Sequence, residues 1–293
     1  MKRAYGLLVL FLAFAILAPA IALAQIPTTE AERQAAFRSL TWRTGETLKL
    51  PISSAQLSVP PAIRALVGPD AVKFYEALNG FAAPAGLEAV LHDPANGATL
   101  YVQKASVGYI RLDDWLELDA DALLKQVSEQ TEEANSKRKA AGVDQLHVLG
   151  WIERPQLDKT AATARWAFEV RDGDTPVINS IALVLTRDGF YKLTWVGEKS
   201  TVKSGLLEAG IANLSVPPGS RHSDYKPGDK VAEYGIAGLI AAMLGVKIAA
   251  KVGLLALAAI FLKKFGVILV AAAGGAVAWA WRRMRRKSQA LQG

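Results

Sequence analysis

The fold is decided by the stretch ATARWAFEVRDGDTPVINSIALVLTRDGFYKLTWV, which covers residues 162–196. Apolar and polar residues alternate from Ala162 to Val170, a pattern that is typical of a strand with one buried face. Two more apolar segments, 177–186 and 190–196, follow after short turns that contain Asp and Gly. Consecutive strands joined by short turns predict an antiparallel β-meander.

One strand and one long helix are predicted before the meander. The strand covers residues 146–152, and the helix runs from Ala120 to Ala140, between Asp119 as its cap and Gly142. The fold class predicted is therefore α+β, with an antiparallel meander that the long amphipathic helix covers. Leu124 and Val127 are expected to pack against the sheet. The residues that share the predicted apolar stripe are Ala120, Leu123, Leu124, Val127, Thr131 and Ala134.

Shorter elements complete the predicted domain, which covers residues 25–215. The segment 216–230, which is rich in Pro and Gly, is predicted to be a linker. Strands are predicted at 47–50, 55–59 and 98–106, and helices at about 30–38, 71–78 and 202–211.

The charge of the chain is unevenly distributed. The formal net charge is +7, but residues 25–230 have a net charge of −3, because the excess of Lys and Arg lies at the two ends. A nucleic-acid-binding domain is disfavoured, since such domains gather basic residues on a folded face. The chain has no Cys, which excludes disulfides, thiol catalysis and Cys-based zinc sites.

Residues 1–24 have the three parts of a secretory signal peptide. Lys2 and Arg3 precede an apolar stretch, and Ala22-Leu23-Ala24 provides a cleavage site before Gln25. The alternative is an uncleaved anchor, which needs about 20 apolar residues and no cleavage site. The mature chain is expected to begin near Gln25, outside the cytoplasm. The absence of Cys favours a bacterial periplasm over a eukaryotic secretory route.

A transmembrane helix is predicted at 265–281, which is 17 residues without a charge. The tail that follows, 282–293, begins with five positive charges in six residues, and such clusters stay on the cytoplasmic side. The domain is therefore expected in the periplasm, anchored to the inner membrane, with the C-terminus in the cytoplasm. Small residues around Gly274 and Gly275 could pack two such helices into a homodimer.

The segment 231–262 allows two interpretations. It is mostly apolar, and its charged residues Glu233, Lys247 and Lys251 fall near one helical face. This pattern favours interfacial or membrane-associated helices. A second span is the alternative, but it would return the basic tail to the periplasm, against the positive-inside rule.

No catalytic, cofactor-binding or metal-binding residue is predicted. The sequence contains none of the HExxH, GxSxG, P-loop or GxGxxG motifs. The three histidines, His92, His147 and His222, are not spaced as metal ligands, so structural or solvent-exposed roles are expected for them.

Two further clusters are candidate sites. An acidic run before the long helix could hold Ca²⁺, but it lacks the glycine turn of such loops, and helix capping is the preferred interpretation. Four tryptophans could form a ligand platform, although core packing is preferred. The acidic residues are Asp113, Asp114, Glu117, Asp119 and Asp121, and the tryptophans are Trp115, Trp151, Trp166 and Trp195.

Several segments, in order and spacing, resemble those of DUF2167, a family of membrane-anchored bacterial proteins defined only as a domain of unknown function. The resemblance spans about Trp42 to Arg286. It implies the same layout of signal, periplasmic domain and anchor, and it implies no activity. Residues 107–117 contain fewer Asp and Gly than is common in the family, which weakens the case for a shared acidic site. The segments are LDADALLKQ (118–126), TEEANSKR (131–138), VLGW (148–151) with Pro155, WA (166–167) and DKVAEYGIAG (229–238).

The sequence supports two hypotheses of different classes. The first is a non-enzymatic envelope module that binds a protein partner or a ligand while anchored to the membrane. The second is a periplasmic hydrolase that uses an unrecognised carboxylate pair. A deep polar pocket with converging carboxylates would favour the enzyme, and an exposed apolar patch would favour a partner surface.

Overall fold

The computed structural model describes residues 26–140, 144–173, 175–199 and 205–244. The chain divides into two units, Met1–Val246 and Lys247–Gly293, and the description below concerns the first. The predicted signal peptide (1–24), the transmembrane helix (265–281), the basic tail and residues 245–262 lie outside the described residues. Among the described residues, no helix has the length and apolar character that a membrane crossing requires.

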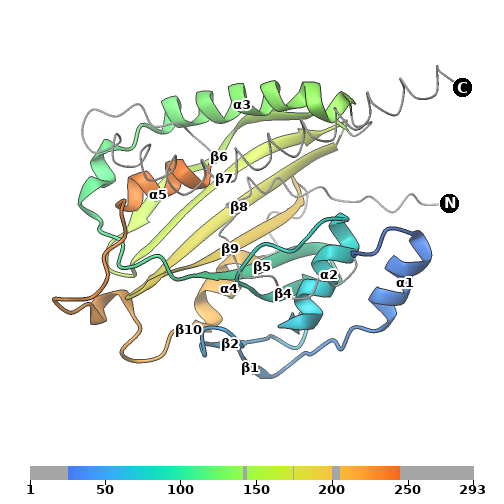
Figure 1. Ribbon diagram of the computed structural model, residues 1–293, viewed down its shortest axis with the longest axis horizontal. Helices are drawn as coiled ribbons and strands as arrows, with labels where there is room; N and C mark the ends of the chain where they lie inside the picture. The colour runs from blue at the N-terminus through green and yellow to red at the C-terminus, as the bar shows by residue number, and fades with distance from the viewer. Residues whose placement is uncertain (1–25, 141–143, 174, 200–204, 245–293) are drawn as a thin grey trace, which may run out of the picture. The chain divides into compact units, whose positions relative to one another are not determined.

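The architecture combines helices with an antiparallel sheet, as the sequence predicts, and a seven-stranded sheet is its largest element (Figure 1). The strand order is β3-β4-β5-β9-β8-β7-β6, so the predicted meander forms one side of the sheet and β9 joins it to β5. The strands are β3 (Arg64–Val67), β4 (Leu87–Asp93), β5 (Ala98–Ala105), β6 (Leu146–Asp158), β7 (Thr163–Asp172), β8 (Thr175–Thr186) and β9 (Gly189–Glu198).

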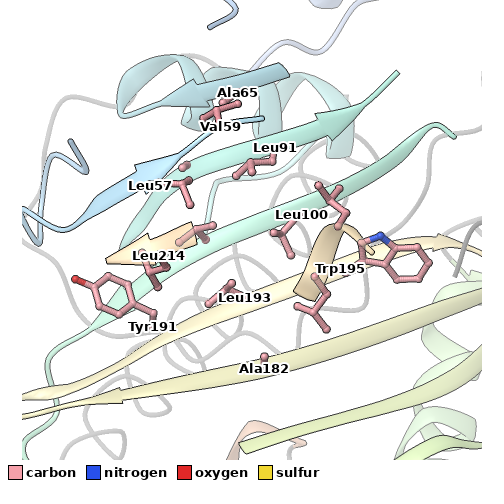
Figure 2. Packing of buried hydrophobic residues seen from close by; sticks show 14 of the residues in the cluster. Leu57, Val59, Ala65, Leu91, Leu100, Ala182, Tyr191, Leu193, Trp195 and Leu214 are labelled. Atoms are coloured by element: carbon pink, nitrogen blue, oxygen red, sulfur yellow. The ribbon is translucent and has the colours of Figure 1, made fainter. Parts of the chain in front are cut away.

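The main core lies between one face of this sheet and a second, three-stranded sheet with order β1-β2-β10 (Figure 2). The period-2 alternation of β9 sends Tyr191, Leu193 and Trp195 to this core. Leu57 from the small sheet and Leu206 from α4 belong to the same cluster. The elements involved are β1 (Thr47–Lys49), β2 (Gln56–Ser58), β10 (Leu214–Ser215) and α4 (Leu206–Asn213).

The opposite face of the large sheet packs against other helices. Phe74 and Tyr75 of α2 (Pro69–Asn79) form a second cluster with Tyr101 of β5 and Val196 of β9. The short helix α1 (Glu30–Arg38) lies beside α2, and α3 (Ala120–Ala140) lies along β6 (Figure 1). Both faces of the sheet are therefore buried in part, which explains why β4 and β5 are apolar without a clean alternation.

The buried face of α3 includes Leu123, Val127 and Thr131 of the predicted stripe, but Ala134, which was predicted to share it, is exposed. Leu123 and Val127 are buried, whereas Leu124 is only half-buried. Thr131 and Asn135 continue the buried stripe, and the Asn135 side chain bonds both backbone groups of Leu146 in β6, at 2.7 and 2.9 Å. Asn135 thus lies on the contact face of α3 because it satisfies the backbone at the start of β6, whereas the Thr131 hydroxyl donates to the Val127 carbonyl within α3.

The sequence did not predict β3 and β4. His92, for which the sequence predicts only a structural or solvent-exposed role, lies in β4, paired with Arg64 of β3 and Thr99 of β5. Glu88, in the same strand, is fully buried and accepts three hydrogen bonds of 2.7 Å from Ile52 and Ser53. A carboxylate and a histidine are unusual in a buried strand, so the composition of β4 does not predict one. The buried carboxylate is tolerated because hydrogen bonds from distant residues satisfy it.

The segment predicted to be a linker differs most from expectation. Residues 216–230 contact the large sheet and continue into α5 (Ile236–Met243). We call residues 216–235 the strap; it is the orange segment between β10 and α5 in Figure 1. The strap contains turns and the short helix η3 (His222–Asp224), and backbone hydrogen bonds join it to the rest of the domain, so the strap is part of the domain.

Candidate functional site

The strap is joined to the loop after β5 by backbone hydrogen bonds. The Tyr109 amide donates to the Lys230 carbonyl, and the Ala232 amide donates to the Tyr109 carbonyl, both at 2.8 Å. Gly108 precedes this ladder with φ of +108°, and a Cβ there would come within 2.9 Å of backbone atoms of residues 230–232. Only glycine allows both the backbone angle and this close approach.

A bidentate ion pair fixes the strap to the turn between β8 and β9. The Arg187 Nε and Nη2 groups donate to the two carboxylate oxygens of Asp229 at 2.7 and 2.6 Å. Both side chains are partly buried, at 28 and 20% exposure. The hydrogen bond from Arg187 and one from the Lys226 amide lower the pKa of Asp229 to about 2.

A second charged network lies in the same turn. The carboxylate of Asp188 accepts hydrogen bonds from Lys104, Ser106 and Thr186 at 2.8, 2.8 and 2.9 Å. The Lys104 side chain is 8% exposed, so its ammonium group is a buried cation that the carboxylate neutralises. Burial raises the pKa of Asp188, but the hydrogen bonds from Lys104 and Ser106 outweigh burial and hold the pKa below its usual range.

A cavity of about 400 Å³ opens between the sheet and the strap. We call it the strap pocket. Its residues come from the loop after β5, the β8–β9 turn and the strap, and all of them are polar or glycine. They include two carboxylates, two cations, two hydroxyls and glycine backbone, and of these Arg187 and Asp229 already bind each other. The lining residues are Ser106, Gly108, Arg187, Asp188, Gly219, Ser220, Asp229 and Lys230.

Aromatic side chains support the strap beside the pocket. The rings of Tyr109 and His222 stack at 4.3 Å, and Tyr225 packs on Tyr109 at 4.2 Å. The Nε2 atom of His222 lies 2.8 Å from the Ile110 carbonyl, so this nitrogen carries the proton and donates. His222 therefore positions the strap.

The other two histidines are remote from the strap pocket in the fold. His92 lies in β4, where burial lowers its pKa, and its Nδ1 is 3.3 Å from the Thr99 hydroxyl. His147, in β6, is 2.7 Å from a carboxylate oxygen of Glu132 in α3.

The carboxylates of the acidic run do not converge on one site, and several of them make separate structural contacts. Asp119 accepts from two amides in the first turn of α3, and Asp114 accepts from the Ala237 and Gly238 amides at the start of α5. Asp121 pairs with Arg154 at 2.6 Å. These carboxylates cap helices or form surface ion pairs. Within the part of the chain that the structure describes, no three His, Asp or Glu residues are grouped so that they could hold a metal ion.

The four tryptophans do not form a common platform. Trp195 lies in the main core, and Trp166 is buried in β7, so the preferred interpretation as core residues holds for both. Trp151, in β6, donates its indole N–H to the Ala120 carbonyl at 3.0 Å, and Trp115 lies in η1 (Asp113–Glu117).

The residues of the strap pocket were missed in the sequence. Arg187 and Asp188 were interpreted only as turn residues, and Asp229 and Lys230 as the end of a linker. No local signal distinguishes them, because the partners of these charges lie 42 to 84 positions away in the sequence.

The Arg187–Asp229 pair should make stability depend on pH. Since the folded pKa of Asp229 is about 2 and an unfolded Asp titrates near about 3.9, its contribution is present above about pH 4 and is lost as the pH falls towards 2. Urea unfolding midpoints measured from pH 5 to 2 should therefore fall less steeply in Asp229→Asn than in the wild type. Asp113→Asn, an exposed control, should keep the wild-type slope. Equal slopes in all three proteins would contradict the assignment.

Comparison with solved structures finds 15 similar chains, among them the following two. The solution structure of the cyanobacterial PsbP protein CyanoP, from Synechocystis sp. PCC 6803, has 11% identity and a TM-score of 0.37, over 59% of this chain and 92% of that chain. A crystal structure from Bacteroides thetaiotaomicron VPI-5482 has 12% identity and a TM-score of 0.29, over 60% of this chain and 49% of that chain. At these TM-scores neither similarity bears on function.

Comparison with known sequences gives a family and no characterised relative. No curated protein matches the chain. The family described as Protein of unknown function (DUF2167) matches residues 43–274, which include the large sheet, the strap and α5. The match covers well over half of the chain, and it agrees with the resemblance carried by the segments between 118 and 238. The chain belongs to the DUF2167 family.

Proposed function

We propose that this protein is a membrane-anchored module of the bacterial envelope whose periplasmic domain binds a small polar ligand at the strap pocket. The observation that carries the binding role is the strap pocket, a cavity of about 400 Å³ with charged groups and hydroxyls from three separate segments. The polar groups that these three segments bring together are of the kind that orient a bound ligand and give a site its specificity.

The location in the envelope rests on the sequence. The signal-like residues 1–24 support export of the domain, and the apolar stretch 265–281 with its basic tail supports one anchor that ends in the cytoplasm. Residues 231–244 include the end of the strap and α5, so α5 directly precedes the apolar C-terminal region.

The alternative function is a hydrolase that uses paired carboxylates. A carboxylic acid that donates a proton near neutral pH needs a raised pKa. The pKa values of Asp188 and Asp229 are both lowered, because each carboxylate accepts hydrogen bonds from a cation. These two groups are therefore ionised acceptors, which supports binding over acid–base catalysis.

Photo-crosslinking in cells tests the binding role. A photoreactive amino acid at Ser220, which lines the strap pocket, is expected to give a defined adduct whose mass separates a small ligand from a protein partner. The same amino acid at Glu129, on the exposed side of α3, is the matched control. Identical adducts at both positions, or none at Ser220, would refute ligand binding at the strap pocket.

The orientation of the anchor gives a separate prediction. Each Lys or Arg near an anionic leaflet contributes about 1 kcal/mol, so the cluster Arg282–Lys287 should keep the C-terminus in the cytoplasm. A reporter enzyme that is active only in the periplasm should be inactive when fused after Gly293 and active when fused after Leu244. Activity at Gly293 would support a two-span hairpin instead.

A further inference from the structure

The short helix η1 leaves apolar side chains outside the core. None of its five residues is buried, although two of them are Trp115 and Leu116. Leu116 is 91% exposed, the highest value for a large hydrophobic residue in the part of the chain that the structure describes. Leu112 and Leu118, which flank η1, are only half-buried. We call residues 112–118 the η1 loop, and its adjacent exposed apolar residues indicate a contact surface.

The η1 loop is fixed to the start of α5. The Asp114 carboxylate accepts hydrogen bonds from the Ala237 and Gly238 amides at 3.2 and 3.3 Å. A Cβ at Gly235 would collide with the same carboxylate, so the two segments approach more closely than any side chain at this position would allow. The position of the η1 loop is therefore tied to that of α5.

The helix α5 leads into the part of the chain that is predicted to reach the membrane. It has eight residues and is therefore about 12 Å long, so the η1 loop at its first turn lies about that far from its last turn. The residues that follow, 245–262, are predicted to be interfacial or membrane-associated, and the predicted span begins at 265. A domain attached through α5 would therefore hold the η1 loop close to the bilayer.

We infer, on the basis of the proposed anchoring, that the η1 loop rests on the lipid bilayer, with Trp115 and Leu116 in the boundary between headgroups and acyl chains. Tryptophan suits this boundary because its ring is apolar and its N–H is polar. Leucine favours it because its side chain leaves water. Since the anchor keeps the loop at a high local concentration near the lipid, a contact of two side chains is sufficient.

The charges near Leu116 indicate the kind of lipid. Residues 111–121 contain five carboxylates and one arginine. Asp121 pairs with Arg154, and Arg111 lies 3.9 Å from Asp113, so negative charge remains in excess. Anionic lipid would be repelled by this excess. The contact is therefore expected with a zwitterionic bilayer.

A fluorescent label beside Leu116 tests the contact. The chain has no Cys, so Glu117→Cys gives a single labelling site for a nitrobenzoxadiazole dye. With the full chain in phosphatidylcholine vesicles, a nitroxide attached to the lipid is expected to quench this dye strongly. The control is Ile52→Cys, at a 62% exposed residue in the turn between β1 and β2, which lies well apart from α5 in Figure 1. The dye at this position should not be quenched.

A second substitution separates the role of Leu116 from that of the dye. Leu116→Ser, added to Glu117→Cys, should lower the equilibrium constant for contact about tenfold or more, as expected for one leucine side chain transferred from water. Quenching should then fall towards that of the Ile52 control. Leu149→Ser, at an exposed leucine of β6, should leave the quenching unchanged. Both leucines are exposed, so neither variant is expected to unfold the domain.

The possible outcomes separate the occupants of this surface. Equal quenching at positions 117 and 52, or quenching that Leu116→Ser leaves unchanged, would overturn the inference. A blue-shifted dye at 117 without lipid quenching would overturn it as well, because a protein surface would then cover the η1 loop. Stronger quenching after addition of phosphatidylglycerol would contradict the expected lipid.

A label in the predicted span distinguishes this inference from the proposed function. If the dye at Val277→Cys is quenched and the dye at Glu117→Cys is not, the chain is anchored and only the contact of the η1 loop is wrong. If neither dye is quenched, the proposed anchoring itself fails.

Discussion

Gly108→Ala is expected to destabilise the domain by more than about 3 kcal/mol. The φ of +108° is strained for any residue with a Cβ, and the new methyl group would lie 2.9 Å from backbone atoms of the strap. The strap would have to move, and the Tyr109 hydrogen bonds to residues 230 and 232 would be lost, at about 1 kcal/mol each. Urea unfolding of the purified chain, followed by tryptophan fluorescence, measures the effect.

Gly97→Ala is the matched control for this substitution. Gly97 also has a positive φ, +68°, but nothing lies within 4 Å of the position of its Cβ. Gly97→Ala should lower the free energy of unfolding by only about 1–2 kcal/mol, because a positive φ is unfavourable for a residue with a Cβ. Equal costs for the two alanine variants would show that the strap is not closely packed on the loop at Gly108.

Leu123→Ala is expected to cost about 2–5 kcal/mol, through the loss of buried surface and the cavity that remains. Leu123 is 4% exposed on the inner face of α3, whereas its neighbour Leu124 is only half-buried. Leu124→Ala should therefore cost clearly less. Glu129→Ala, on the exposed side, should change stability by less than about 0.5 kcal/mol.

The comparison of Leu123 with Leu124 tests the orientation of α3. The two variants remove the same atoms from adjacent positions of one helix, so helix propensity is equal for both. If their urea midpoints shift equally, the face assigned to α3 is wrong, and with it the contact of Asn135 with Leu146.

The sequence predicts the meander well, since local pattern and tertiary environment agree there. The even-numbered residues from Ala162 to Val170 are buried, as the alternation indicates. Gly173 lies between β7 and β8, Arg187 and Asp188 lie between β8 and β9, and these strands pair in antiparallel register. A half-buried strand and a short turn each have a local signature in composition, which needs no knowledge of distant residues.

Strands that are buried on both faces are harder to predict, because they lack the alternation of apolar and polar residues. In β4, Ala89 belongs to the main core and Val90 to the second cluster, so successive residues are buried against different elements. The helix α3 was located from its caps and period, but the choice between Leu123 and Leu124 depends on where β6 lies. A periodic pattern places a face to within about one residue, and only packing selects the residues that are covered.

The sequence by itself determined the strands of the meander, the helix at 120–140 and the family, because each is encoded in neighbouring residues or in ordered motifs. Only the tertiary structure decided that the strap is part of the domain and that a polar pocket lies beneath it. The physical reason is that the pocket depends on pairs such as Arg187 with Asp229 and Lys104 with Asp188. A charge in a turn has the same local sequence whether it faces water or a partner, and the folded sheet alone brings these partners together.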